Sequence, residues 1–158
     1  MKKTDGLKVK GSFRLQIEDG PTGKIVGDSG WHENLIVNDG FNNFLAKSLG
    51  GISGSSQITH MAIGTGGAPI STDQTLAGEQ SVRAAVTAAT SSTSKAVQFT
   101  ATFSSSASFV TATKNISNIG LFATSTAAGG TIFAGNTYTS SACATNQNVN
   151  ATYTISFT

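Results

Sequence analysis

Strict alternation between apolar and polar residues at both ends of the chain constrains the fold more than any other feature. Over residues 7–18 the odd-numbered positions are apolar or glycine, and the even-numbered positions are polar. The pattern returns over residues 149–157, where the odd-numbered positions are again apolar. A period of two is typical of a β-strand that buries one face and leaves the other in water. We therefore expect the chain to begin and to end with a half-buried strand.

Turn-forming residues divide the rest of the chain into short extended segments. Residues 19–23 are a cluster of Asp, Gly, Pro and Thr, so residues 24–26 read as the returning strand of a hairpin. Residues 68–80 read as a polar loop around Leu76. Further strands are predicted where apolar and β-branched residues recur, at residues 31–37, 58–63, 82–89, 96–103, 109–114, 119–123 and 131–139.

One segment has the periodicity of a helix. Phe41, Phe44, Leu45 and Leu49 share one helical face, and the Gly-Gly pair that follows is typical of a helix end. Strands do not alternate with helices elsewhere, so a parallel sheet is not expected. The sequence therefore predicts one mainly β domain spanning residues 1–158. Its expected fold is an antiparallel β-sandwich, jelly-roll-like, of about eight or nine strands, with one short helix near residues 40–49.

Charged side chains are scarce and unevenly placed. They make up 11% of the 158 residues, against about a quarter in ordinary soluble proteins, while Ser and Thr together number 42. The last carboxylate side chain is Glu79. The net charge of +2 comes without a cluster of Lys and Arg, which argues against nucleic-acid binding. No apolar run approaches the length of about 18 residues that a membrane span needs.

Cysteine usage and the first residues bear on the compartment. The single cysteine, Cys143, cannot form an internal disulfide, so the chain has no secretory disulfide framework. Lys2 and Lys3 look like the start of a signal peptide, but no apolar run follows them. We therefore expect the protein to act where it is made, or to leave the cell as part of a larger assembly.

The residues that usually carry catalysis or bind metals are few. His32 and Glu33 are neighbours on a predicted strand, where adjacent side chains point to opposite faces, so they do not share an ion. His60 lies in an apolar strand, where a packed and hydrogen-bonded histidine is the common case. Cys143 has alanine on both sides and no neighbouring base or cation to activate its thiol. We expect no catalytic residue, no metal and no cofactor.

The run Gly64-Thr65-Gly66-Gly67 superficially looks like a phosphate-binding loop. Such a loop needs a helix start directly after it, and a nucleotide site also needs a Lys–Ser/Thr pair, whereas an Ala-Pro pair follows here. A tight loop is the better interpretation, with glycine required for a positive φ or for close approach of another backbone segment.

Edge protection is missing from the second half of the sequence. Residues 96–158 contain one lysine and no proline, the residues with which monomeric β proteins commonly protect their edge strands. Either the edges close on themselves in a barrel, or other subunits cover them. Surfaces rich in Thr and Asn suit close protein–protein contacts, because charge is depleted at the centre of interfaces. This pattern favours a structural subunit of an assembly over a freely diffusing enzyme.

A series of short motifs runs in a fixed order along most of the chain. It comprises the glycine-punctuated segment 9–40, residues 58–66, a polar loop with Asp73 and Leu76, the pair Glu79 and Arg83, and a later Gly120-Leu121-Phe122 followed by Gly129-Gly130. The series resembles tailed-bacteriophage virion proteins, in particular the N-terminal domain of phage tail-collar fibre proteins and related stand-alone proteins. Those proteins usually carry an acidic residue beside the glycine of the Gly-Leu-Phe strand, where this chain has Asn118-Ile119.

The resemblance implies a virion component that acts by binding, has no enzymatic site and is assembled in the host cytoplasm. Two positions on the outer surface of the particle stay open: a tail, baseplate or fibre-associated protein, and a capsid decoration (cement) protein. The resemblance also implies a homotrimer that binds the major capsid protein or tail and baseplate proteins. The candidate subunit contacts are residues 1–5 and Trp31, Gly64, Thr65, Gly66, Gly67, Asp73, Leu76 and Arg83.

A carbohydrate-binding, lectin-like module for attachment to a host surface is the alternative from another class. Aromatic rings stack on sugars, and Trp31 and an exposed Tyr138 are the residues expected to do so. An enzyme is the weakest interpretation of the sequence.

Overall fold

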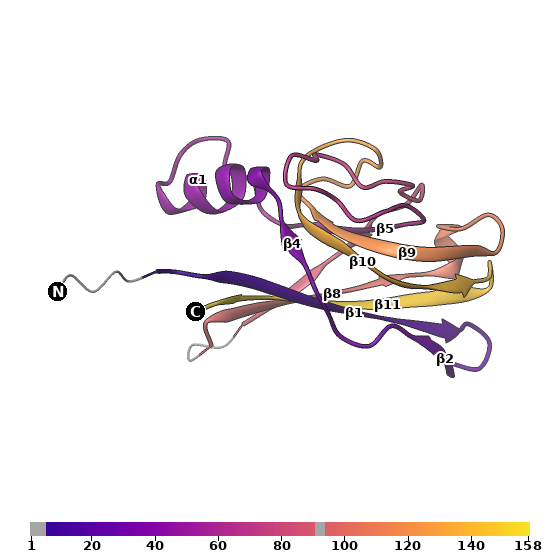
Figure 1. Cartoon of the computed structure of the whole chain (residues 1–158). Coiled ribbons are helices and arrows are strands. Elements are labelled where there is room, and N and C mark those ends of the chain that lie inside the picture. Colours follow the sequence, from indigo (N-terminus) through magenta and orange to yellow (C-terminus); the bar gives the residue numbers. More distant parts are fainter. Residues whose placement is uncertain (1–5, 91–93) are drawn as a thin grey trace.

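The computed structural model describes residues 6–90 and 94–158 and has two antiparallel sheets that face each other as a β-sandwich (Figure 1). Sheet A has the strand order β2-β1-β11-β8-β7, with β3 also paired to β1. Its strands are β1 (Val9–Asp19), β2 (Ile25–Asp28), β3 (His32–Glu33), β7 (Thr87–Ala89), β8 (Ala96–Phe103) and β11 (Gln147–Phe157). Sheet B has the order β4-β10-β9-β5-β6. Its strands are β4 (Leu35–Ile36), β5 (His60–Gly64), β6 (Ala84–Ala85), β9 (Lys114–Phe122) and β10 (Ile132–Cys143).

The expected mainly β, antiparallel fold class is confirmed, and so are both alternating segments. β1 and β11 are neighbours in sheet A and pair without interruption from Val9 opposite Phe157 to Asp19 opposite Gln147. Phe13 and Tyr153 lie opposite each other in this register, and both are fully buried. The two patterns read from the sequence therefore describe the inner faces of two strands that pair with each other.

Two clusters of buried side chains hold the sandwich together. The larger lies between the sheets and includes Phe13, Phe103, Ile119 and Tyr153. The smaller lies on the opposite side of sheet B, because successive residues of a strand point to opposite faces. There Leu76 from loop 68–80 packs with Val37, Ala62, Phe122 and Ile132. Both faces of sheet B are buried as a result.

Two segments that each read as a single strand change sheet halfway along. Residues 31–37 give β3, which pairs with β1 of sheet A, and then β4, which pairs with β10 of sheet B. Residues 82–89 give β6, which pairs with β5 of sheet B, and then β7, which pairs with β8 of sheet A. One such segment runs along each side of the sandwich. Each covers only part of a long strand's edge: β4 pairs with Ala134 and Gly135 of β10, and β7 pairs with residues 98–100 of β8. Assembly through the remaining edges stays a prediction.

The helical segment differs from the amphipathic helix that the sequence predicts. It consists of a π-helical turn, η1 (Gly40–Ala46), followed by the short helix α1 (Lys47–Leu49). Hydrogen bonds from residue i to i+5 widen the turn, so residues spaced for a period of 3.6 no longer share a face. Phe44 is buried, with its ring 5.2 Å from that of Phe133, but Phe41 is exposed and Leu49 is 94% exposed.

The strand predicted at residues 109–114 is wrong. A short 3-10 helix, η2 (Ser105–Ala107), is followed by a loop in which Phe109 and Val110 fill the core without pairing to a neighbour, and β9 begins only at Lys114. The strands predicted at 119–123 and 131–139 overlap the longer strands β9 and β10. Residues 6–90 and 94–158 form eleven strands where about eight or nine were expected, because five of them have only two to four residues.

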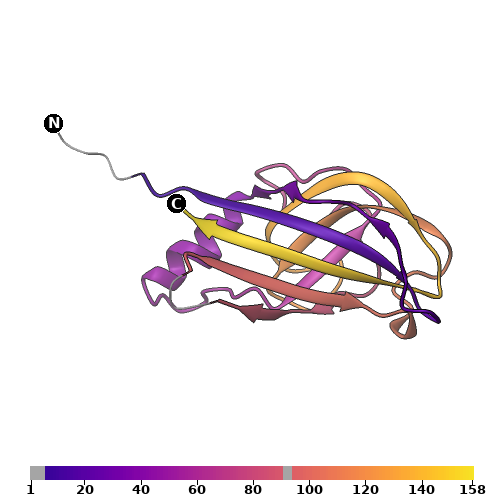
Figure 2. The same cartoon turned by 90° about the horizontal axis from the view of Figure 1, so that it is seen from below.

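The sandwich is elongated, and its two ends differ. The helical segment lies at the same end as the start of β1 and the end of β11, and the hairpin of β1 and β2 lies at the other end (Figures 1 and 2). Within the described residues, no helix is both long and apolar enough to cross a bilayer.

Candidate functional site

The run of glycines at 64–67 forms a tight loop against a second loop segment. The backbone N–H of Thr65 donates to the carbonyl of Gly78 (3.1 Å), and that of Gly66 donates to the carbonyl of Ala77 (3.1 Å). A Cβ atom on Gly66 would lie 2.4 Å from the oxygen of Ala77, whereas Gly67 has open space around it. None of these glycines has a positive φ. Close backbone approach, one of the two reasons predicted for glycine here, is therefore the one that applies.

Asn118 of β9 links the loop at residues 64–67 to the loop segment around Ala77. Its side chain is fully buried, and its Nδ2 donates to the carbonyls of Gly67 (3.0 Å) and Ala77 (2.9 Å). Two carbonyl oxygens need a donor, which the amide supplies and a carboxylate would not. In place of the acidic residue that the resemblance leads us to expect, this chain therefore has an amide, Asn118, which can donate to both loop carbonyls.

Loop 68–80 is fastened to the outer face of sheet B. Leu76 is buried there in the smaller cluster, and the backbone N–H of Ile132 donates to the carbonyl of Gln74 (3.1 Å). The carboxylate of Asp73 accepts a hydrogen bond from the backbone N–H of Ile70 (2.9 Å) and so shapes a turn. Leu76 and Asp73, both predicted as subunit contacts, are therefore an anchor and a turn former within the chain.

Arg83 is buried and has no hydrogen-bond donor left for a neighbouring subunit. Its Nε and one terminal nitrogen hold the two carboxylate oxygens of Glu79 at 2.6 and 3.1 Å. The remaining N–H groups donate to the carbonyl and hydroxyl of Thr124 and to the carbonyl of Gly129. The guanidinium carbon lies 3.6 Å from the centre of the Phe122 ring, a cation–π arrangement. The Arg83–Glu79 pair thereby ties the loop between β9 and β10 to the segment that precedes β6.

The predicted contact residues thus fall into two places. Gly64 to Gly67, Asp73, Leu76 and Arg83 lie in loops on and beside sheet B, and among them Thr65 and Gly67 are exposed. Trp31 lies apart from them, between β2 and β3 at sheet A, and is 54% exposed. Residues 1–5, also predicted as contacts, are outside the described residues.

The aromatic pair expected for sugar stacking is not formed. Tyr138 is buried, packed against the rings of Phe13 (6.2 Å between centroids) and His32 (6.2 Å), and burial raises the pKa of its hydroxyl. The expectation that Tyr138 is exposed is wrong, because β10 turns this side chain toward the core. Of the two residues expected to stack on sugars, Trp31 is the exposed one.

The histidines and the cysteine are placed in structural settings. Ring nitrogen Nε2 of His32 lies 2.8 Å from the carbonyl of Ser29, and Nδ1 of His60 lies 2.9 Å from the hydroxyl of Thr59. Burial, with a smaller effect of the Arg83 charge, lowers the pKa of His60. Burial raises the pKa of the Cys143 thiol to about 11, which makes it a poor nucleophile. Among the described residues no group of three His, Cys, Asp or Glu side chains gathers to hold a metal ion.

One apolar surface feature was not predicted from the sequence. At the end of the sandwich that carries the helical segment, a groove of about 370 Å³ opens between that segment and the ends of β8 and β11. We call this surface the helix end; its lining includes Phe44, Leu45, Ile58, Val97, Phe99 and Phe157. Phe41, Leu49 and Ile52 of the helical region add exposed apolar side chains. Phe41 was missed because the helical periodicity assigned it to the core.

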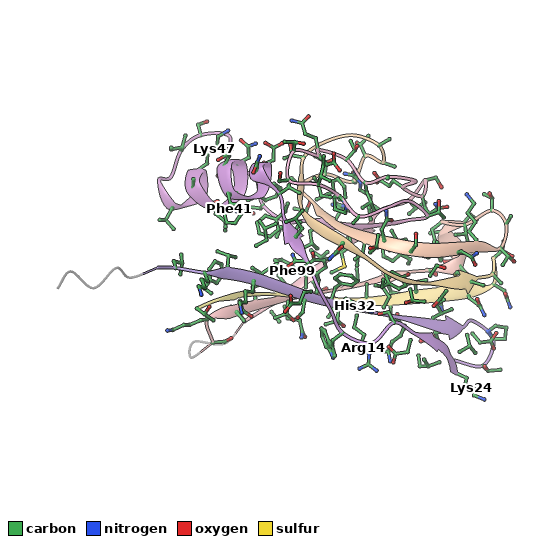
Figure 3. The ribbon with its side chains drawn as sticks, in the orientation of Figure 1. Arg14, Lys24, His32, Phe41, Lys47 and Phe99 are labelled. Carbon is green, nitrogen blue, oxygen red and sulfur yellow. The ribbon has the colours of Figure 1, made fainter. Side chains whose placement is uncertain are left out.

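The groove lies at the left of Figure 3, where Phe41 and Lys47 mark the helical segment and Phe99 the sheet below it. No protein-family model, curated protein or solved structure matches the chain. A function must therefore be argued from these surfaces.

Proposed function

We propose that this chain is a non-enzymatic structural subunit of a tailed-phage virion that acts by binding neighbouring proteins. The observation that carries the proposal is the helix end, where an open apolar groove is surrounded by exposed Phe41, Leu49 and Ile52. Apolar side chains that are exposed together in one region, especially around a groove, are a common mark of a site of association. The ordered series of motifs that resembles phage proteins supplies the virion setting.

The outer face of sheet A supports the same role. β8 and β11 are neighbouring strands of this sheet. Their outward-facing side chains include Thr100, Thr102, Thr152 and Thr154, and none of them is charged. Burying such a face costs less than burying charges, because no ion has to leave water. The neighbouring strand β1 carries Lys10, Arg14 and Glu18 on the same face, so the uncharged surface that suits packing against another subunit is confined to β8 and β11.

Two places on the particle fit this role: a capsid decoration protein bound to the major capsid protein, and a protein associated with the tail, baseplate or fibres. A homotrimer is the self-assembly that the motif resemblance implies.

The experiment that tests the proposal is the number of copies per purified particle, measured by quantitative mass spectrometry on the phage that encodes the chain. Because virions repeat their subunits by symmetry, on the order of hundreds of copies would indicate capsid decoration and about a dozen a tail or baseplate position. Absence of the chain from purified particles would overturn the proposal.

One observation keeps a carbohydrate-binding function as a second candidate: the indole of Trp31 is 54% exposed and has a free face. Screening the purified protein on a glycan array tests it. Binding that is lost in Trp31→Ala would favour the lectin, whereas absence of binding to every glycan would favour the structural role.

A further inference from the structure

We infer that the helix end of one copy binds the β1–β2 hairpin of a second copy, so that the chain self-associates head to tail. The inference deepens the proposed function and rests on it for its biological setting. Head-to-tail association requires that each molecule carry two complementary surfaces. The two surfaces must also lie too far apart to bind each other within one chain.

The receptor surface is apolar at its centre and basic at its rim. The groove is lined by apolar side chains, among them Phe44, Val97 and Phe157. Lys47 belongs to α1, at the groove's helical side. Lys8 and Lys95 lie on either side of the last residues of β11. The backbone N–H of Lys8 donates to the carbonyl of Thr158, and the backbone N–H of Phe157 donates to the carbonyl of Lys95. The stretches that supply the lining, residues 44–58, 97–99 and 155–157, contain no Asp or Glu. A partner of matching chemistry must offer apolar side chains flanked by carboxylates.

The hairpin end has this composition. β2 is an edge strand whose Ile25 and Val26 are exposed, 41% and 53% respectively. The hairpin residues 18–28 carry three carboxylates, Glu18, Asp19 and Asp28, and one cation, Lys24. Asp28 is ion-paired with Arg14 of β1, so Glu18 and Asp19 are the carboxylates that a partner's lysines can meet. Apolar side chains within an acidic frame therefore lie on the same molecule as an apolar groove within a basic frame. Complementary charges of this kind steer partners into register and exclude like-charged pairings.

The two surfaces lie at opposite ends of the sandwich. Lys24 marks the hairpin at the right of Figure 3, and Lys47 marks the helical segment at the left. The hairpin of a chain cannot reach its own groove, so the contact has to form between copies. It joins two different surfaces and is heterologous: it closes into a ring when successive rotations add up to a full turn, and otherwise continues as an open row. Two helix ends do not bind each other in this scheme, because their lysines would repel.

Two single variants test the contact, one on each surface. Val26→Asp places a charge on the hairpin and leaves the groove intact, and Leu49→Asp places a charge beside the groove and leaves the hairpin intact. Both positions are exposed, so both variants are expected to fold, which circular dichroism checks. Ile70→Asp is the matched control, since Ile70 is an equally exposed apolar residue on loop 68–80, away from both surfaces.

Light scattering after size exclusion measures the mass of each protein over a range of concentrations. We expect the wild-type mass to rise above that of one chain, the control to behave like the wild type, and each test variant to associate at least tenfold more weakly. Mixing the two test variants should give a complex of two chains, because one intact groove and one intact hairpin remain.

A wild-type chain that stays monomeric at every concentration would overturn the inference. So would a mixture of the two variants that forms no complex, or a control variant that loses association as well. These results concern the purified chain alone, whereas the copy number per particle tests the virion role. Failure of the head-to-tail contact and failure of the proposed function are thus distinguishable.

Discussion

At the scale of single residues, Arg83 and Glu79 form a buried ion pair. Removing one partner of such a pair leaves the other charge buried without compensation, which commonly costs about 3–5 kcal/mol. We expect Arg83→Ala to lower the free energy of unfolding by about that amount, measured by urea denaturation. The joint replacement Arg83→Met with Glu79→Leu should restore most of it. A single variant as stable as the wild type would contradict the assigned role of Arg83.

Asn118 makes a second residue-scale prediction, because its buried amide donates to two carbonyl groups. Asn118→Asp would set a carboxylate against those oxygens, so we expect a loss of about 2–4 kcal/mol at neutral pH. The neutral acid is the form that the folded protein tolerates, so the pKa of this carboxyl is raised above its unfolded value and the destabilisation shrinks as the pH falls. Denaturation of variant and wild type at neutral and acidic pH measures this. A difference that does not depend on pH would contradict it.

Sequence reasoning selected Arg83, Asp73 and Leu76 but did not assign their environment. Each lies in a polar loop or beside one, and nothing in the local pattern tells whether such a residue faces a neighbouring subunit or its own chain. The outcome depends on loop 68–80 folding back over sheet B, a contact between segments far apart in sequence. For Gly64 to Gly67 the reasoning went further, because the absence of a following helix already excluded a phosphate site.

At the scale of elements, the helical segment departs most from its sequence pattern, and it yields a prediction with an internal control. Phe44 is buried against Phe133, whereas Phe41 in the same π-helical turn is exposed. Phe44→Ala should cost about 3–5 kcal/mol because it leaves a cavity in the core. Phe41→Ala should change stability by less than about 1 kcal/mol, as is usual for exposed positions. Thermal and urea unfolding compare the two variants at low protein concentration; equal losses would contradict the π-helical assignment.

The long strands could be predicted from the sequence, but the short ones could not. β1 and β11 are recognisable in the sequence because each exposes one face to solvent and buries the other. Apolar and polar residues therefore alternate along both strands. Residues 31–37 and 82–89 carry an extended pattern, yet nothing local marks Asn34 or Val86 as the point at which the chain passes from one sheet to the other. The apolar residues Phe109 and Val110 predict a strand. In the structure they are buried in a loop, and the packing around that loop sets its course.

At the scale of the whole molecule, the two ends of the chain meet. Lys8 and Thr158 exchange backbone hydrogen bonds of 2.7 and 2.8 Å at the end of the β1–β11 pairing. Joining the termini with a short flexible linker should therefore need no rearrangement. We expect a circular permutant opened between Ser53 and Gly54, in the exposed loop after α1, to fold with the same circular dichroism spectrum and to lose no more than about 2 kcal/mol of stability. A permutant that unfolds without cooperativity would contradict the pairing of the chain ends.

The pairing of β1 with β11 also sets when sheet A can form during synthesis. β1 leaves the ribosome early but has to wait for β11, its neighbour in sheet A, which is made after every other described strand. A nascent or prematurely terminated chain therefore has an open sheet and an incomplete groove, since Phe157 lines that groove. The groove that we propose for self-association is therefore complete only after β11 has been made and has joined sheet A.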